Sequence, residues 1–266
     1  MCFSTERLLT EGSLSLTWGP SRSEEYIAGY LLKGEVTLDQ LQPTEIYETG
    51  IVGYYLPPEV SSFATNPRRP VDLLVDLKGR GPIIPQKFWT PYTSKNRQDF
   101  VAKAVLHLPI YFIGDGGKLG MSYAHAVDEA PISMLAGEKE ETFDFDKSSV
   151  DLHICLWPYK SKESTIYLGK KPVTHRKLAQ KVFARLKDLF ENPPELDIMH
   201  KKYADWKIGS GEIELHNILL IGVVQVSSGS FVPIMQLANS GRPRWLPGMD
   251  EVLEPFGDVE KPLRVN

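Results

Sequence analysis

One acid and one base in this chain are spaced so that they would share a face of a strand. They lie in residues 73–79, which read LLVDLKG and follow a stretch where acidic and aliphatic residues alternate. Because side chains two residues apart in a strand point the same way, Asp76 and Lys78 would stand next to each other. A strand with a charged edge face that ends in a Lys-Gly turn would have the same sequence, so the pair indicates either reactive chemistry or a plain sheet edge.

The Asp76-Leu77-Lys78 step resembles part of the PD-(D/E)xK nuclease signature. That resemblance implies a Mg²⁺-dependent phosphodiesterase in which Asp76 shares the metal with an upstream acid and a metal-held water attacks the phosphodiester. The upstream Pro-Asp element is missing, and Glu48 and Glu59 are the acids that could replace it. Magnesium is the cofactor of this alternative, and the leading prediction, non-catalytic binding, requires no cofactor.

A second metal candidate is the pair His125 and Asp128, three residues apart and therefore on one side of a helix if a helix forms there. Such a pair needs a further ligand, and an ordinary exposed or hydrogen-bonded histidine is the alternative. The glycine-rich stretch 114–120 lacks the spacing of a phosphate-binding loop and predicts a hairpin turn. Cys155 alternates with apolar residues, which is typical of a small buried thiol.

The clearest helix of the sequence, Thr174–Glu191, carries a basic face. It has an apolar stripe at i, i+4 spacing, starts at a threonine able to cap it and ends before Asn-Pro-Pro. The basic residues on the opposite arc are Arg176, Lys177, Lys181, Arg185 and Lys187. In a chain of net charge -4 this face predicts a surface for an acidic protein, for nucleic-acid phosphates, or for the chain's own acidic stretch Glu138–Asp146. A solvated helix face with no partner is the remaining alternative.

The longest apolar passage, Glu214–Leu237, predicts a β-hairpin at the centre of the core. Its first half, Ile218–Val226, is apolar on both alternations, as expected for a strand buried on both faces. A Ser-Ser-Gly-Ser turn leads to the second half, Phe231–Leu237. Pro233 in that half predicts a sheet edge or a bulge, since proline has no N–H to donate.

The order of elements predicts an α+β fold with mostly antiparallel sheets and two main helices, Asn96–Leu108 and Thr174–Glu191. Two blocks, opening with VDLLVDL at Val71 and VDLHICL at Val150, share the order strand–strand–helix–strand–strand. That is the order of a β-grasp (ubiquitin-like) unit, so one or two such units are expected. The predicted domains are a β-rich N-terminal segment (1–56), a Pro-rich linker (57–70), a first α+β unit (71–137), an acidic connector (138–149), a second α+β unit (150–237) and a Pro-rich tail (238–266).

Composition narrows the class of protein. Of 266 residues, 42% are hydrophobic and 24% are charged, as in ordinary water-soluble globular proteins. Two cysteines cannot build a disulfide framework, and no apolar run approaches the roughly 20 residues that span a bilayer. We therefore expect an intracellular protein, cytoplasmic or nuclear, with no membrane partner. With no complete catalytic set, its leading predicted function is non-catalytic binding of another protein, through strand edges or the basic helix.

Overall fold

The computed structural model of the chain describes residues 5–46, 50–59, 69–75, 79–89, 104–113, 118–127, 142–143, 147–169, 172–197 and 205–239. Its helices are α1 (Thr5–Glu11), α2 (Ser13–Trp18), α3 (Pro20–Glu25), the π-helix η1 (Tyr26–Leu31), the 3-10 helices η2 (Leu38–Gln40) and η6 (Leu215–Asn217), α5 (Tyr123–Val127) and α6 (His175–Glu191). Its strands are β1 (Gln42–Glu45), β2 (Val52–Tyr55), β3 (Asp72–Leu73), β4 (Ile110–Tyr111), β5 (Met121–Ser122), β6 (Thr142–Phe143), β7 (Ser149–Ile154), β8 (Lys162–Tyr167), β9 (Val173–Thr174), β10 (Ile218–Ser227) and β11 (Ser230–Leu237).

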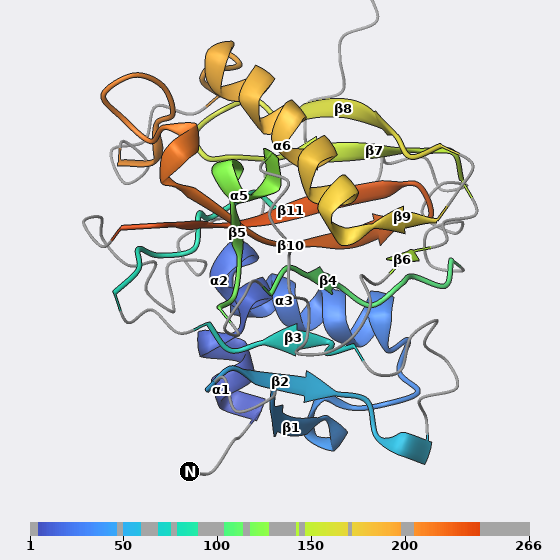
Figure 1. The fold of residues 1–266 in the computed structure, drawn as a ribbon. Coiled ribbons are helices and arrows are strands. Elements are labelled where there is room, and N and C mark those ends of the chain that lie inside the picture. The colour runs from blue at the N-terminus through green and yellow to red at the C-terminus, as the bar shows by residue number, and fades with distance from the viewer. Residues whose placement is uncertain are drawn as a thin grey trace, which may run out of the picture.

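A six-stranded sheet runs through the middle of the molecule (Figure 1). Its order is β4-β10-β11-β7-β8, and β5 also pairs with β10. The predicted hairpin is confirmed: β10 and β11 pair antiparallel, with Leu220 opposite Met235 and Val224 opposite Val232. Nearly all of β10 is buried, as the lack of polar alternation in that run indicated, and all of β11 is buried as well.

The position of Pro233 differs from the prediction. It lies neither at a sheet edge nor at one of the two register shifts, because β11 has β10 on one side and β7 on the other. The parallel pairing with β7 covers only Ser230 and Phe231. Beyond it, residues 81–86 run alongside β11, and the Gln86 side-chain amide donates to the Pro233 carbonyl at 2.5 Å. Pro233 therefore lies where the pairing of β11 with β7 has ended and the Gln86 side chain contacts β11 instead.

The helix predicted from Thr174 is confirmed as α6, and the hydroxyl of Thr174 caps it by accepting from the Lys177 N–H at 3.2 Å. The predicted stripe is buried: Leu178, Val182, Leu186, Leu189 and Phe190. In the chain the helix follows β7, β8 and the short strand β9, and it precedes β10 and β11. Within this set the sheet order is β8-β7-β11-β10, and the two middle strands are parallel.

The N-terminal segment is not β-rich throughout, so that prediction is wrong for residues 5–31, which form α1, α2, α3 and η1. Strands begin only at β1 and β2. The alternation of Leu14, Leu16 and Trp18 covers five residues, too few to separate a strand from a buried helix. All six residues of α2 are buried, and a helix covered on every side has no amphipathic period to reveal it.

Two apolar cores lie on opposite faces of the central sheet. The core under α5 and α6 contains Leu220 and Met235, whereas Ile221 and Val232 belong to the core shared with the N-terminal helices and the sheet β1-β2-β3. Figure 1 shows this layering, with α6 across one face and the blue helices on the other. All strand pairs between named strands are antiparallel except β7 with β11, so the predicted α+β class is confirmed within the described ranges.

Several predicted features fall wholly or partly on residues outside the described ranges. The helix predicted over Asn96–Leu108 is described only from residue 104, and residues 104–108 are not helical. Of the predicted tail, 238–239 alone are described. The strands β4 and β5, which belong to the predicted first unit, pair with β10 of the predicted second unit in one sheet. Across the described part of the chain, no helix has the length and apolar character needed to cross a membrane.

Candidate functional site

The basic face of α6 is the predicted site that the structure describes most fully. Lys177 and Lys187 are exposed, and Arg176, Lys181 and Arg185 are half-buried. They lie on the side of the helix away from the apolar core, because the buried stripe occupies the side that faces the sheet. The five residues therefore share one accessible arc, as the helix period predicted.

Arg185 and Lys187 are tied to the fold. Arg185 Nη2 donates to the backbone carbonyl of Thr165 at 2.9 Å, so this guanidinium covers part of strand β8 at the end of the sheet. Lys187 Nζ lies 3.8 Å from Glu191 Oε1, one turn further along the helix. Both side chains therefore interact with groups of the same chain.

Lys177 and Lys181 are different. Within the described residues no carboxylate lies at ion-pair distance from either ammonium group. They are one helical turn apart, about 6 Å along the axis. Their charges therefore point to solvent with no balancing acid among those residues.

The acidic connector comes close to the start of α6. Strand β6 lies inside the connector and pairs antiparallel with β9, with Thr142 opposite Thr174 and Phe143 opposite Val173. Since Thr174 caps α6, the connector backbone passes beside the first turn of the basic helix. Contact between the connector and the basic face, one of the alternatives from sequence, thus stays open.

The metal candidate at His125 is half described. His125 Nδ1 lies 3.2 Å from Ser122 Oγ, which also accepts from the His125 N–H at 3.3 Å. Asp128 lies outside the described residues. No group of three or more potential metal ligands occurs among the residues that the structure covers.

The nuclease candidate lies outside the described residues, since residues 76–78 contain both Asp76 and Lys78. The strand before them is buried from Val71 to Val75. Glu59, a substitute for the missing upstream acid, is exposed, and Glu48 is also outside the described ranges. The Mg²⁺-dependent reading therefore stays a prediction.

Cys155 fits the expected buried thiol. It is 2% exposed, and burial raises the pKa of its thiol, which disfavours the nucleophilic thiolate. Beside it Lys87 is buried, with its ammonium over the Trp157 ring at 4.9 Å, donating to the Tyr159 carbonyl at 2.7 Å and paired with Asp197. These contacts tie loops to the sheet.

Sequence reasoning missed a buried polar cluster around Asp72. Its Oδ1 accepts from Ser13 Oγ at 2.6 Å, from Tyr111 OH at 3.0 Å and from the Leu73 N–H at 2.7 Å. The Leu14 N–H lies 3.3 Å from both carboxylate oxygens. Asp72 has no exposed surface, so no substrate can reach this cluster in the folded state. The available signal was an acid inside the apolar run that starts at Val71.

Comparison of the chain with protein-family models, with curated proteins and with solved structures gives no match. Functional conclusions therefore depend on the residues themselves.

Proposed function

We propose that this protein is a non-catalytic binding module that holds an acidic segment of another protein on the basic face of α6. The observation that carries the proposal is the pair Lys177 and Lys181, which no acid among the described residues balances. Isolated exposed charges add little to stability, so both lysines can pair with carboxylates of a partner without a cost to the fold.

The length of the positive stretch favours a short acidic peptide. From Arg176 to Lys187 the helix advances about 16 Å, which matches about five residues of extended chain. Beyond it, Asp188 and Glu191 make the last turn acidic. A nucleic-acid duplex would place phosphates along that acidic turn as well, and the whole chain carries a net charge of -4. Binding of nucleic acid through the same face is therefore the second candidate.

The strand order supports a β-grasp-like unit as the scaffold of this surface. A hairpin of β7 and β8, a crossing helix and a second hairpin, with β7 and β11 parallel in the middle, is the arrangement that such a unit uses. The helix lies across one sheet face and turns its polar arc outward. We place this module inside the cell, in the cytoplasm or nucleus, on the sequence argument given above.

The test is a binding titration with a fluorescein-labelled hexaglutamate peptide, read by fluorescence anisotropy at low and high salt. The wild-type protein is expected to bind at low salt and to lose the peptide as salt screens the charges. The Lys177→Ala/Lys181→Ala variant is expected to bind about two- to thirtyfold more weakly, since each of the two exposed ion pairs contributes about 0.2–1 kcal/mol.

A matched control removes two lysines from other surfaces. Lys118 and Lys147 are both exposed and lie outside α6, so Lys118→Ala/Lys147→Ala changes the net charge equally. If both double variants lose the same affinity, binding follows net charge and the α6 surface is not the site. Tighter, salt-sensitive binding of a labelled RNA or DNA than of the peptide would favour the second candidate.

The nuclease alternative has its own test. Labelled DNA and RNA are incubated with Mg²⁺ and with wild-type or Asp76→Ala protein. Cleavage that disappears in the variant and on removal of Mg²⁺ would replace the binding proposal with a metal-dependent phosphodiesterase.

A further inference from the structure

The carboxylate of Asp72 joins three parts of the molecule that lie far apart in the sequence. Asp72 belongs to β3, Ser13 to the start of α2, and Tyr111 to β4 at the side of the six-stranded sheet. The two hydroxyls also lie 3.0 Å from each other, so they close a triangle with the carboxylate. One buried group thus links the N-terminal helices, the small sheet and the central sheet.

The chain backbone is built around this carboxylate. Gly12, just before α2, makes an antiparallel bridge to Leu74, and the Val75 N–H donates to the Glu11 carbonyl at 3.1 Å. A Cβ atom on Gly12 would lie only 2.5 Å from Asp72 Oδ2. The start of α2 therefore approaches the carboxylate as closely as a residue without a side chain allows.

No cation balances the carboxylate within the described residues, where the groups that hydrogen-bond to it are hydroxyls and backbone N–H groups. The titratable groups that face it are tyrosines: Tyr111 from β4, Tyr26 from η1 and Tyr54 from β2. Burial raises the pKa of each tyrosine, with the Asp72 charge adding to the rise, so all three stay neutral at physiological pH.

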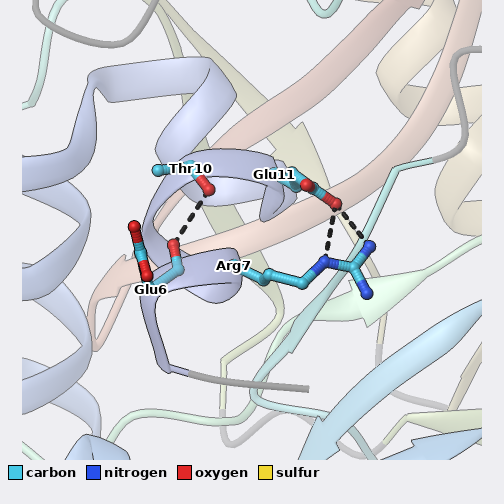
Figure 2. A network of polar contacts seen from close by, with 4 residues as sticks. All are labelled: Glu6, Arg7, Thr10 and Glu11. Atoms are coloured by element: carbon cyan, nitrogen blue, oxygen red, sulfur yellow. Dashed lines mark hydrogen bonds and ion pairs between the residues drawn. The ribbon is translucent and has the colours of Figure 1, made fainter. Parts of the chain in front are cut away.

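Two charged residues of α1, Arg7 and Glu11, form an ion pair with each other. Figure 2 shows Arg7 Nε donating to Glu11 Oε2, at 3.1 Å. The charges of these two residues shift the pKa of Tyr54 in opposite directions, Arg7 lowering it and Glu11 raising it. In the same helix the Thr10 hydroxyl donates to the Glu6 carbonyl at 2.9 Å. The proton on Asp72 therefore controls whether this buried junction is neutral or carries a charge without a counter-ion.

We propose that Asp72 is a proton-sensitive lock between the N-terminal layer, residues 5–46, 50–59 and 69–75, and the central sheet. When Asp72 is protonated the layer is held tightly; when it is ionised the layer opens more often. Opening would uncover the sheet face that contains Ile221, Val224 and Val232, which is otherwise buried under the layer.

The direction follows from the shift in pKa. Burial raises the pKa of Asp72 from 3.8 to about 6, even though the hydrogen bonds from Ser13, Leu73, Tyr111 and Leu14 pull it down. The folded state therefore binds a proton that the open chain has lost at pH values between the two. The stabilisation is complete below pH 4 and is lost as pH rises through about 6.

The test is amide hydrogen exchange of the full chain at pH 5.0 and pH 7.5, corrected for the intrinsic effect of pH on exchange. In the wild type, protection of peptides containing Leu14 and Leu73 is expected to fall by about tenfold between the two pH values, because part of the stabilisation is already lost at pH 5.0. In Asp72→Asn, an uncharged side chain of the same shape, the fall should vanish. Peptides from β7 and β8 serve as the internal control and should change far less.

A second variant keeps the test decisive if Asp72→Asn does not fold. Tyr111→Phe removes one hydrogen-bond donor to the ionised carboxylate, so the protonated form of Asp72 is favoured further. If the lock is right, the loss of protection should therefore move to higher pH than in the wild type. A move to lower pH would contradict the lock. A pH-independent wild type, or an equal loss of protection in β7 and β8, would overturn the lock.

Discussion

At the scale of single residues, Gly12 is a position where one added methyl group has a large effect. A Cβ there would press on Asp72 Oδ2 and on the Leu8 carbonyl, and neither can retreat, because one belongs to a buried hydrogen-bond cluster and the other to the backbone of α1. We expect Gly12→Ala to lower the free energy of unfolding by about 2–3 kcal/mol or more, measured by urea denaturation.

The matched substitution is Gly29→Ala in η1, where an added Cβ meets no atom within 4 Å. There the change should be neutral or stabilising by about 0.5–1 kcal/mol, since alanine is the better helix former. Equal effects at both glycines would contradict the close approach of α2 to Asp72.

At the scale of elements, α6 depends on its cap. Thr174→Ala removes the oxygen that accepts from the Lys177 N–H, and we expect it to cost about 1 kcal/mol of unfolding free energy. Thr174→Ser keeps the oxygen and should recover most of the loss. If serine were as poor as alanine, the methyl group of Thr174 in β9 would be the important part.

The elements that sequence reasoning found are those with a strong local pattern. The α6 stripe around Leu178 and Val182 and the unbroken apolar run of β10 each carry enough residues to define a period or a buried strand. The helix α2 was missed because Ser13, Ser15 and Thr17 are as buried as its apolar residues, so neither polarity nor period marked it. Burial of that kind depends on distant segments, which no local window contains.

The candidate sites divide in the same way. The basic arc with Lys177 and Lys181 was predictable because one helix holds all of it. In the Asp72 cluster, Asp72 lies 59 positions after Ser13 and 39 positions before Tyr111, so only the fold brings these residues together. The sequence shows an acid inside an apolar run at Asp72, but not which residues contact it.

At the scale of the whole molecule, the two cores share one sheet and should melt as one. Leu220 and Ile221 are neighbours on β10, both fully buried, yet they point into opposite cores. We expect Leu220→Ala and Ile221→Ala each to cost about 2–5 kcal/mol, and to shift the same single transition. Tryptophan fluorescence and far-ultraviolet circular dichroism should give coincident curves. Two separable transitions, each sensitive to one variant, would mean that the cores are independent domains.

The central position of β10 and β11 also sets when the protein can fold during its synthesis. These strands occupy residues 218–237, yet β10 pairs with β4 more than a hundred residues earlier, at Gly222 opposite Tyr111. Both cores therefore lack the two strands that they share, β10 and β11, until most of the chain has left the ribosome. Until then the apolar residues of the N-terminal helices and of α6 have no sheet to cover them, which makes the nascent chain a client for chaperones that bind exposed apolar segments.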